Sequence, residues 1–162
     1  MTLISDRTWH ILRDALRGRV HASRLIDLDA SALFSIVSDV RFHGRWVPLT
    51  RIKAPLRRIE PGDSFSAHTL GLRDAMTLVS ISDGVAHFRK EGPLLFGSSD
   101  IAVREVAPGV GRVSWDYDVS IGGPLPRFIA RALAGLVLAP ILRIVIDRME
   151  ADIAANKHRL NR

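Results

Sequence analysis

The order of its segments constrains this chain more than any single motif, because strand-like segments follow one another without intervening helices. Between residues 51 and 121, runs of strand length alternate with turns rich in Gly, Pro and Asp. From Pro126 to about Leu160 the pattern becomes helical. Strands followed by one long helix predict an α+β domain with an antiparallel sheet that this helix covers. The six strands expected here span residues 51–56, 64–70, 74–81, 85–91, 98–106 and 112–121.

The last of these strands has the clearest alternation of apolar and polar residues. Its odd-numbered residues from Val113 to Ile121 are apolar or aromatic, and the even-numbered residues between them are Ser or Asp. Successive side chains of a strand point to opposite faces of the sheet. One face of the sheet is therefore expected to be buried and the other to contact water.

The part before residue 51 adds a seventh strand and two short helices. Residues 19–28 alternate as a half-buried strand. Asp29 or Ser31 is then placed to cap a helix, and a second short helix ends near Trp46. Together with the later segments, this order predicts about seven strands in one sheet.

Residues 1–18 precede this pattern and are expected to form an N-terminal extension. Trp9, Leu12 and Leu16 stand at helical spacing, which favours a short helix. Residues 19–162 are expected to form a single domain, since 162 residues correspond to one domain of ordinary size.

The net charge of +6 invites the hypothesis of a nucleic-acid partner, but the distribution of charge does not favour it. The 20 Arg and 3 Lys are scattered along the chain, and aromatic residues make up only 6% of it. Nucleic-acid sites usually need clustered basic residues, and single-strand sites add stacking aromatics. We therefore expect no nucleic-acid partner, and at most a weak attraction to anionic membrane surfaces.

The most apolar segment, residues 132–142, is 11 residues long and flanked by Arg131 and Arg143. It spans about half of a bilayer core and therefore predicts a buried helix rather than a transmembrane one. No signal-peptide pattern precedes the domain and no Cys occurs, so a cytoplasmic location is expected. Since the segment is apolar nearly all round, a second surface is expected to cover it: the N-terminal helix, a second subunit of a homodimer, or a membrane.

Three segments carry a resemblance to a known family: Ser23 to Ala30, Leu33 to Asp39, and the triplet Trp46-Val47-Pro48. They resemble the START-related SRPBCC superfamily, in its polyketide cyclase/dehydrase and lipid-transport-like branch, over about residues 19–160. The resemblance implies a helix-grip fold, in which a curved antiparallel sheet wraps around a long C-terminal helix and leaves a cavity between them. It also implies binding of apolar small molecules, with catalysis in a minority of members.

The cavity that the resemblance implies would be lined by the C-terminal helix and the last strand. Arg24 shares strand parity with Val20 and Ile26, so it is a candidate for pairing with an anionic group of a ligand. The alternative is that these side chains fill a solid core and that Arg24 reaches solvent. The ligand-binding candidates are Arg24, Trp115, Tyr117, Phe128, Leu133, Leu136 and Ile141.

The sequence does not establish a reaction. None of the six His residues stands at metal-ligand spacing with another ligand, and no nucleotide-binding fingerprint occurs, so neither a metal nor a cofactor is expected. His68 and Tyr117 are the weak candidates for acid–base catalysis. The favoured function is binding or carriage of a hydrophobic small molecule such as a lipid, isoprenoid or polyketide. The alternatives are a cyclase or dehydratase acting in the same cavity, and a protein- or membrane-interaction module.

Overall fold

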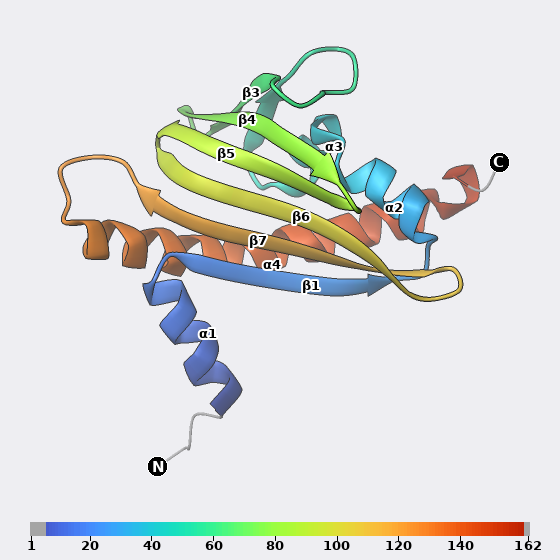
Figure 1. The fold of residues 1–162 in the computed structure, drawn as a ribbon, viewed down its shortest axis with the longest axis horizontal. Helices are drawn as coiled ribbons and strands as arrows, with labels where there is room; N and C mark the ends of the chain where they lie inside the picture. Colours follow the sequence, from blue (N-terminus) through green and yellow to red (C-terminus); the bar gives the residue numbers. More distant parts are fainter. Residues whose placement is uncertain (1–5, 161–162) are drawn as a thin grey trace.

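The computed structural model describes residues 6–160, with side chains over residues 10–156. A curved sheet of seven antiparallel strands wraps around the long C-terminal helix, and two short helices lie beside one end of it (Figure 1). The α+β helix-grip fold is thus confirmed. In chain order the elements are α1 (Asp6–Leu16), β1 (Arg19–Ile26), α2 (Ala30–Val37), α3 (Val40–Trp46), β2 (Thr50–Lys53), β3 (Ser64–Thr69), β4 (Leu72–Ser82), β5 (Val85–Pro93), β6 (Leu95–Ala107), β7 (Val110–Ile121) and α4 (Arg127–Leu160).

The strand order across the sheet is β1-β7-β6-β5-β4-β3-β2. Every strand from β2 to β6 pairs with the next strand in the chain, and β1 completes the sheet by pairing with β7 (Arg24 opposite Val113). The alternation predicted for the last strand is also found. Val113, Trp115 and Val119 are buried on the concave face, whereas Asp116 and Asp118 are partly exposed.

Two strand boundaries differ by three residues from the sequence prediction, and the others differ by two residues or fewer. β2 ends at Lys53 rather than residue 56, where Pro55 has no N–H to donate to a neighbouring strand. β6 begins at Leu95 rather than residue 98, because its pairing with β7 continues through Gly97 to Leu95 opposite Ile121. Gly97 has φ +133 there, which a residue with a side chain rarely adopts.

Helices α2 and α3 close one end of the curved sheet. The Asp29 carboxylate caps α2 by accepting hydrogen bonds from the N–H groups of Ser31 and Ala32, at 3.0 and 3.1 Å. Trp46, at the end of α3, is fully buried, and its indole N–H donates to Asp152 of α4 at 3.0 Å. The Trp46–Asp152 bond thus joins α3 to α4, and α2 packs on the core through the fully buried Leu33 and Val37.

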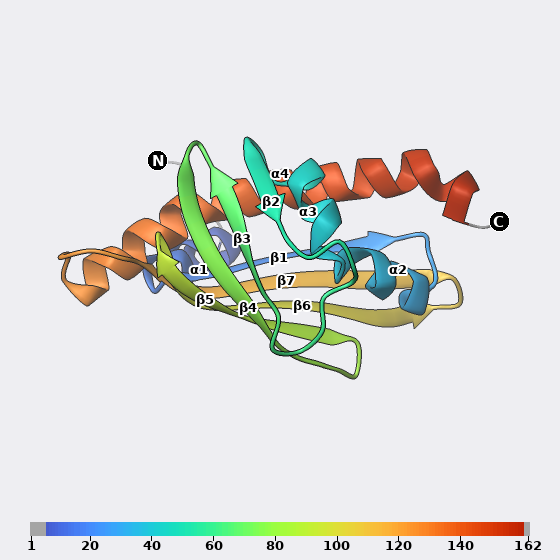
Figure 2. The same ribbon diagram turned by 90° about the horizontal axis from the view of Figure 1, so that it is seen from above.

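Helix α4 lies along the concave side of the sheet, and its contacts with the sheet concentrate on β1 and β7 (Figure 2). Its C-terminal half packs into the solid core through Ile146, Met149 and Ile153. Among the described helices it is the one long and apolar enough to cross a membrane, by length and composition alone. Core helices of soluble proteins meet the same criterion, and α4 is the core helix of this fold.

Helix α1 supplies part of the second surface expected for the apolar segment of α4. It lies outside the sheet, beside the start of β1 (Figure 1). Its C-terminal end contacts α4 at Gly135, where the two backbones approach closely. A methyl group at position 135 would lie 1.7 Å from the carbonyl oxygen of Ala15. The side chain of Trp9, predicted to be on the apolar face of this helix, lies outside the described residues. Contact with a homodimer partner or a membrane stays a prediction.

Replacing Gly135 with Ala is expected to displace α1 from α4, because the added methyl overlaps the Ala15 carbonyl. We expect a loss of about 1–3 kcal/mol in the free energy of unfolding, as is typical of overpacked sites, and faster amide hydrogen exchange in α1. The matched control is Gly44→Ala in α3, where the nearest atom would lie 3.6 Å away. Unchanged exchange in α1 of the Gly135→Ala variant would contradict the close packing.

Candidate functional site

A cavity of about 360 Å³ lies between the N-terminal half of α4 and the concave face of the sheet. Most of its wall is apolar, with contributions from β2 to β7, from α4, and from the segment that follows α3. The apolar and aromatic lining residues are Val47, Pro48, Ile52, Phe65, Ala67, Leu70, Leu72, Met76, Phe88, Leu94, Leu95, Ile101, Trp115, Tyr117, Ile121, Ala134, Val137, Leu138, Ile141, Leu142 and Val145.

The cavity opens to solvent between the β3–β4 hairpin and α4. Three lining residues there are more than half exposed: Leu70 at 75%, Leu72 at 55% and Val137 at 54%. The hairpin turn consists of Leu70 and Gly71, both with positive φ (50° and 81°). A Leu rarely adopts this conformation, and it costs about 1–2 kcal/mol. The turn therefore holds an apolar side chain at the cavity mouth at some cost in stability.

A buried ion pair is the most polar feature of the wall. The Lys90 ammonium on β5 donates to a carboxylate oxygen of Asp74 on β4 at 2.8 Å, and both side chains are at most 8% exposed. The other carboxylate oxygen of Asp74 accepts from the Leu95 N–H at 3.2 Å. The Lys90 ammonium also lies 5.3 Å from the centre of the Tyr117 ring, in a cation–π arrangement.

His43 forms a second buried polar group in the wall. Its imidazole Nε2 donates to the carbonyl oxygen of Val37 at 2.8 Å, and its ring centre lies 5.0 Å from that of Trp115. Burial lowers the pKa of His43 from 6.5 to about 4, so the imidazole is neutral near pH 7. The indole N–H of Trp115 in turn donates to the Ser99 hydroxyl at 3.0 Å.

Of the residues named from the sequence, Trp115, Tyr117 and Ile141 lie in the cavity wall. The other three helix candidates, Phe128, Leu133 and Leu136, are exposed on the outer side of α4 and do not line it. Helical spacing groups residues into faces, but it does not fix which face points inward when apolar residues occur all round. Whether a ligand touches the lining residues stays a prediction.

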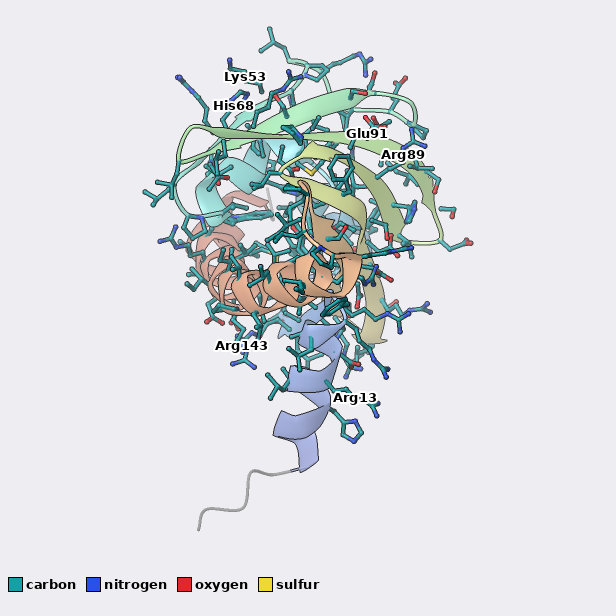
Figure 3. The ribbon with its side chains drawn as sticks, turned by 90° about the vertical axis from the view of Figure 1, so that its left-hand side faces the viewer. Arg13, Lys53, His68, Arg89, Glu91 and Arg143 are labelled. Carbon is teal, nitrogen blue, oxygen red and sulfur yellow. The ribbon has the colours of Figure 1, made fainter. Side chains whose placement is uncertain are left out.

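Arg24 and His68 also lie outside the cavity lining. Arg24 does point to the side of the sheet that faces α4, but β1 is an edge strand, so its guanidinium pairs with Asp147 and with Glu150 (3.2 Å) on the outside of the helix. His68 lies near Lys53 at the outer side of the β2–β3 edge (Figure 3), and its Nε2 is 3.1 Å from the Ser66 hydroxyl. Neither side chain is brought together with Tyr117.

The sequence reasoning missed the polar groups Lys90, Asp74 and His43. The signal for Lys90 is its strand parity with the buried residues Ala86 and Phe88, which predicts an inward-pointing Lys. Its neighbours in sequence, Arg89 and Glu91, point outward from the sheet and pair with each other at 2.9 Å (Figure 3). His43 could have been found from its position three residues after Val40 and three before Trp46, on one helical face.

Comparison with known proteins agrees with this geometry. The family model described as "Polyketide cyclase / dehydrase and lipid transport" matches residues 17–154, which is most of the chain. The chain belongs to this family. No functionally curated protein matches its sequence significantly.

Solved structures with the same fold come from several bacteria. A START superfamily protein from Mycobacterium smegmatis has a TM-score of 0.65 and 16% identity, over 85% of this chain and 97% of that one. A protein from Arthrobacter aurescens has a TM-score of 0.68 and 13% identity, over 88% and 89%. A hypothetical protein from Helicobacter pylori has a TM-score of 0.64 and 14% identity, over 83% and 87%. At these identities, the likeness shows the fold of the family.

The low pKa of His43 predicts a pH dependence of stability. The pKa is about 4 in the folded chain and 6.5 as the ordinary value, so between these values the unfolded chain binds a proton that the folded chain does not. The free energy of unfolding should therefore fall as the pH decreases from 6.5 to 4, by up to about 3 kcal/mol from this group. Denaturant unfolding, followed from neutral pH down to about pH 4.5, measures it.

The variant for this test is His43→Gln, which offers an amide donor to the Val37 carbonyl and has no ionisable group. Its stability should depend less on pH than that of the wild type. The matched control is His10→Gln at an exposed position of α1, which should keep the wild-type dependence. Equal pH slopes for His43→Gln and the wild type would show the prediction to be wrong.

Proposed function

We propose that this protein binds or carries a hydrophobic small molecule in the cavity between its sheet and α4. The observation that carries the proposal is the cavity itself, with about 360 Å³ of space and a mostly apolar lining. This volume falls within the range of roughly 300–1,000 Å³ that is typical of ligand sites. Lipid, isoprenoid and polyketide-like molecules have the required apolar character.

The energetics of an apolar cavity support the same proposal. Protein interiors are normally close-packed, and an unfilled apolar space loses the contacts that its lining would otherwise make. An apolar molecule that enters the cavity recovers those contacts and removes its own surface from water. The exposed leucines at the mouth, Leu70 and Leu72, extend the apolar wall to solvent, where a ligand would enter.

Native mass spectrometry and organic-solvent extraction of the purified protein would test the proposal directly. We expect a co-purified small molecule, or uptake of the neutral fluorescent probe N-phenylnaphthylamine with an increase in its emission. A protein that carries no ligand and takes up no apolar probe would contradict the proposed function.

Filling the cavity gives a sharper test. Ala67 on β3 lines it, so Ala67→Trp should place an indole ring in the ligand space and lower probe affinity by about tenfold or more, since each 1.4 kcal/mol of lost binding is a factor of ten. The matched control is Val79→Trp, which adds an indole at an exposed position of β4 outside the cavity. Equal probe affinity in the two variants would place the bound probe elsewhere on the molecule.

The second candidate function is a cyclase or dehydratase without metal or nucleotide cofactor. The observation that favours it is the convergence of Lys90, Asp74 and Tyr117 at one part of the wall, since general acid–base chemistry needs such groups near a substrate. Incubation with polyketide-like carbonyl compounds, followed by mass spectrometry, separates the two candidates. A carrier returns its ligand chemically unchanged, whereas an enzyme produces a product at a rate that falls in Tyr117→Phe.

A further inference from the structure

Lys90 is an unusual residue for the wall of an apolar cavity. Its side chain is 5% exposed, and taking an ammonium out of water costs several kcal/mol unless partners compensate. The backbone explains the direction of the side chain, because Lys90 shares strand parity with the buried residues Ala86 and Phe88. The partners of the ammonium therefore decide what the residue can do.

The described partners do not use the full donor capacity of the Lys90 ammonium. An ammonium has three N–H donors. One is taken by the Asp74 carboxylate at 2.8 Å, and a second faces the Met76 sulfur at 3.1 Å, which is a weak acceptor. The Tyr117 ring offers its π face at 5.3 Å rather than a lone pair. Among the described residues, Asp74 is thus the one strong acceptor, and the ammonium can donate further to a molecule in the cavity.

The Tyr117 hydroxyl is a second donor of the same wall. No described residue forms a hydrogen bond with it, although its ring stacks on Trp115 with centres 6.2 Å apart. Asp74, by contrast, already accepts from Lys90 with one oxygen and from the Leu95 N–H with the other. The groups with unused N–H or O–H donors at this part of the wall are therefore Lys90 and Tyr117, and both call for an acceptor on the ligand.

Charge balance limits the kind of acceptor. Lys90 and Asp74 together are neutral, so a carboxylate ligand would bring a second buried negative charge against a single positive one. Burying an uncompensated charge is expensive, whereas a neutral carbonyl oxygen has two lone pairs and adds no charge. A carbonyl also brings no donor of its own, so the Lys90 ammonium and the Tyr117 hydroxyl can satisfy its oxygen without a further partner.

We infer that the cavity selects hydrophobic molecules that carry a neutral carbonyl group, whose oxygen accepts hydrogen bonds from the Lys90 ammonium and the Tyr117 hydroxyl. This inference rests on the proposed function, since it specifies the ligand of the same cavity. The hydrocarbon part of the ligand lies against the apolar wall towards Leu70 and Val137 at the mouth.

A series of ligands with equal carbon number tests the inference on the wild-type protein. The four compounds are a hydrocarbon (hexylbenzene), a ketone (hexanophenone), an alcohol (phenylhexanol) and a carboxylate (the anion of phenylhexanoic acid). Their affinities are compared by displacement of N-phenylnaphthylamine. We expect the ketone to bind about tenfold more tightly than the hydrocarbon, as is typical of a hydrogen bond to a charged group, and more tightly than the alcohol and the carboxylate. Equal affinity of ketone and hydrocarbon would overturn the inference while leaving the proposed function in place. If none of the four displaces the probe, both are wrong.

A double variant identifies the donor. Lys90→Met together with Asp74→Asn removes both charges, so that neither is left buried alone, and the Asn oxygen can still accept from the Leu95 N–H. The ratio of ketone to hydrocarbon affinity should fall from about ten to a smaller value that reflects the remaining Tyr117 donor, and Tyr117→Phe should lower it in part. The matched control is Arg89→Met at the adjacent outward-facing position, which should keep the wild-type ratio. A double variant that retains the wild-type ratio would exclude Lys90 as the donor.

Discussion

A single helix has to cover the concave face of a curved seven-stranded sheet, and the rest of the structure depends on how far that cover extends. Helix α4 contacts the sheet mainly along β1 and β7. Towards its C-terminus, α2 and α3 fill the remaining space, and large side chains such as Met149 and Ile153 complete a solid core. Towards its N-terminus no such filling element is present among the described residues, and the gap between helix and sheet is the cavity. The fold is therefore closely packed at one end and hollow at the other.

The polar groups buried around the cavity follow the rule that buried charge requires partners. Lys90 is held by Asp74, Asp74 by the Leu95 N–H, and His43 donates to the Val37 carbonyl while burial keeps its imidazole neutral. These bonds make a charged pair compatible with an apolar wall. Lys90 lines the cavity and has one strong acceptor among the described residues, Asp74, so donor capacity remains at the wall.

The fold could be predicted closely from the sequence, and the site only in part. Strand parity identified Trp115 and Tyr117 as inward-facing, because a strand has only two faces and the polar one was evident from Asp116 and Asp118. The same argument was available for Lys90, but a charged residue is ordinarily assigned to solvent. On α4 the prediction reached Ile141 but placed Phe128 inward, although it is exposed, because a helix that is apolar all round has no unique buried face.

The sequence by itself determined the order of the elements, the antiparallel sheet and the buried face of β7, because these follow from local periodicity and turn residues. The family was indicated by the resemblance of Ser23 to Ala30, Leu33 to Asp39 and Trp46-Val47-Pro48, and not by periodicity. Only the tertiary structure decided that the space between α4 and the sheet is a cavity, and that Lys90 and Asp74 meet in its wall. Asp74 and Lys90 lie on neighbouring strands offset by irregular pairing between β4 and β5, so their contact depends on register and on sheet curvature. Neither quantity is encoded in the pattern of any one segment, since both arise when distant strands pair and bend around the helix.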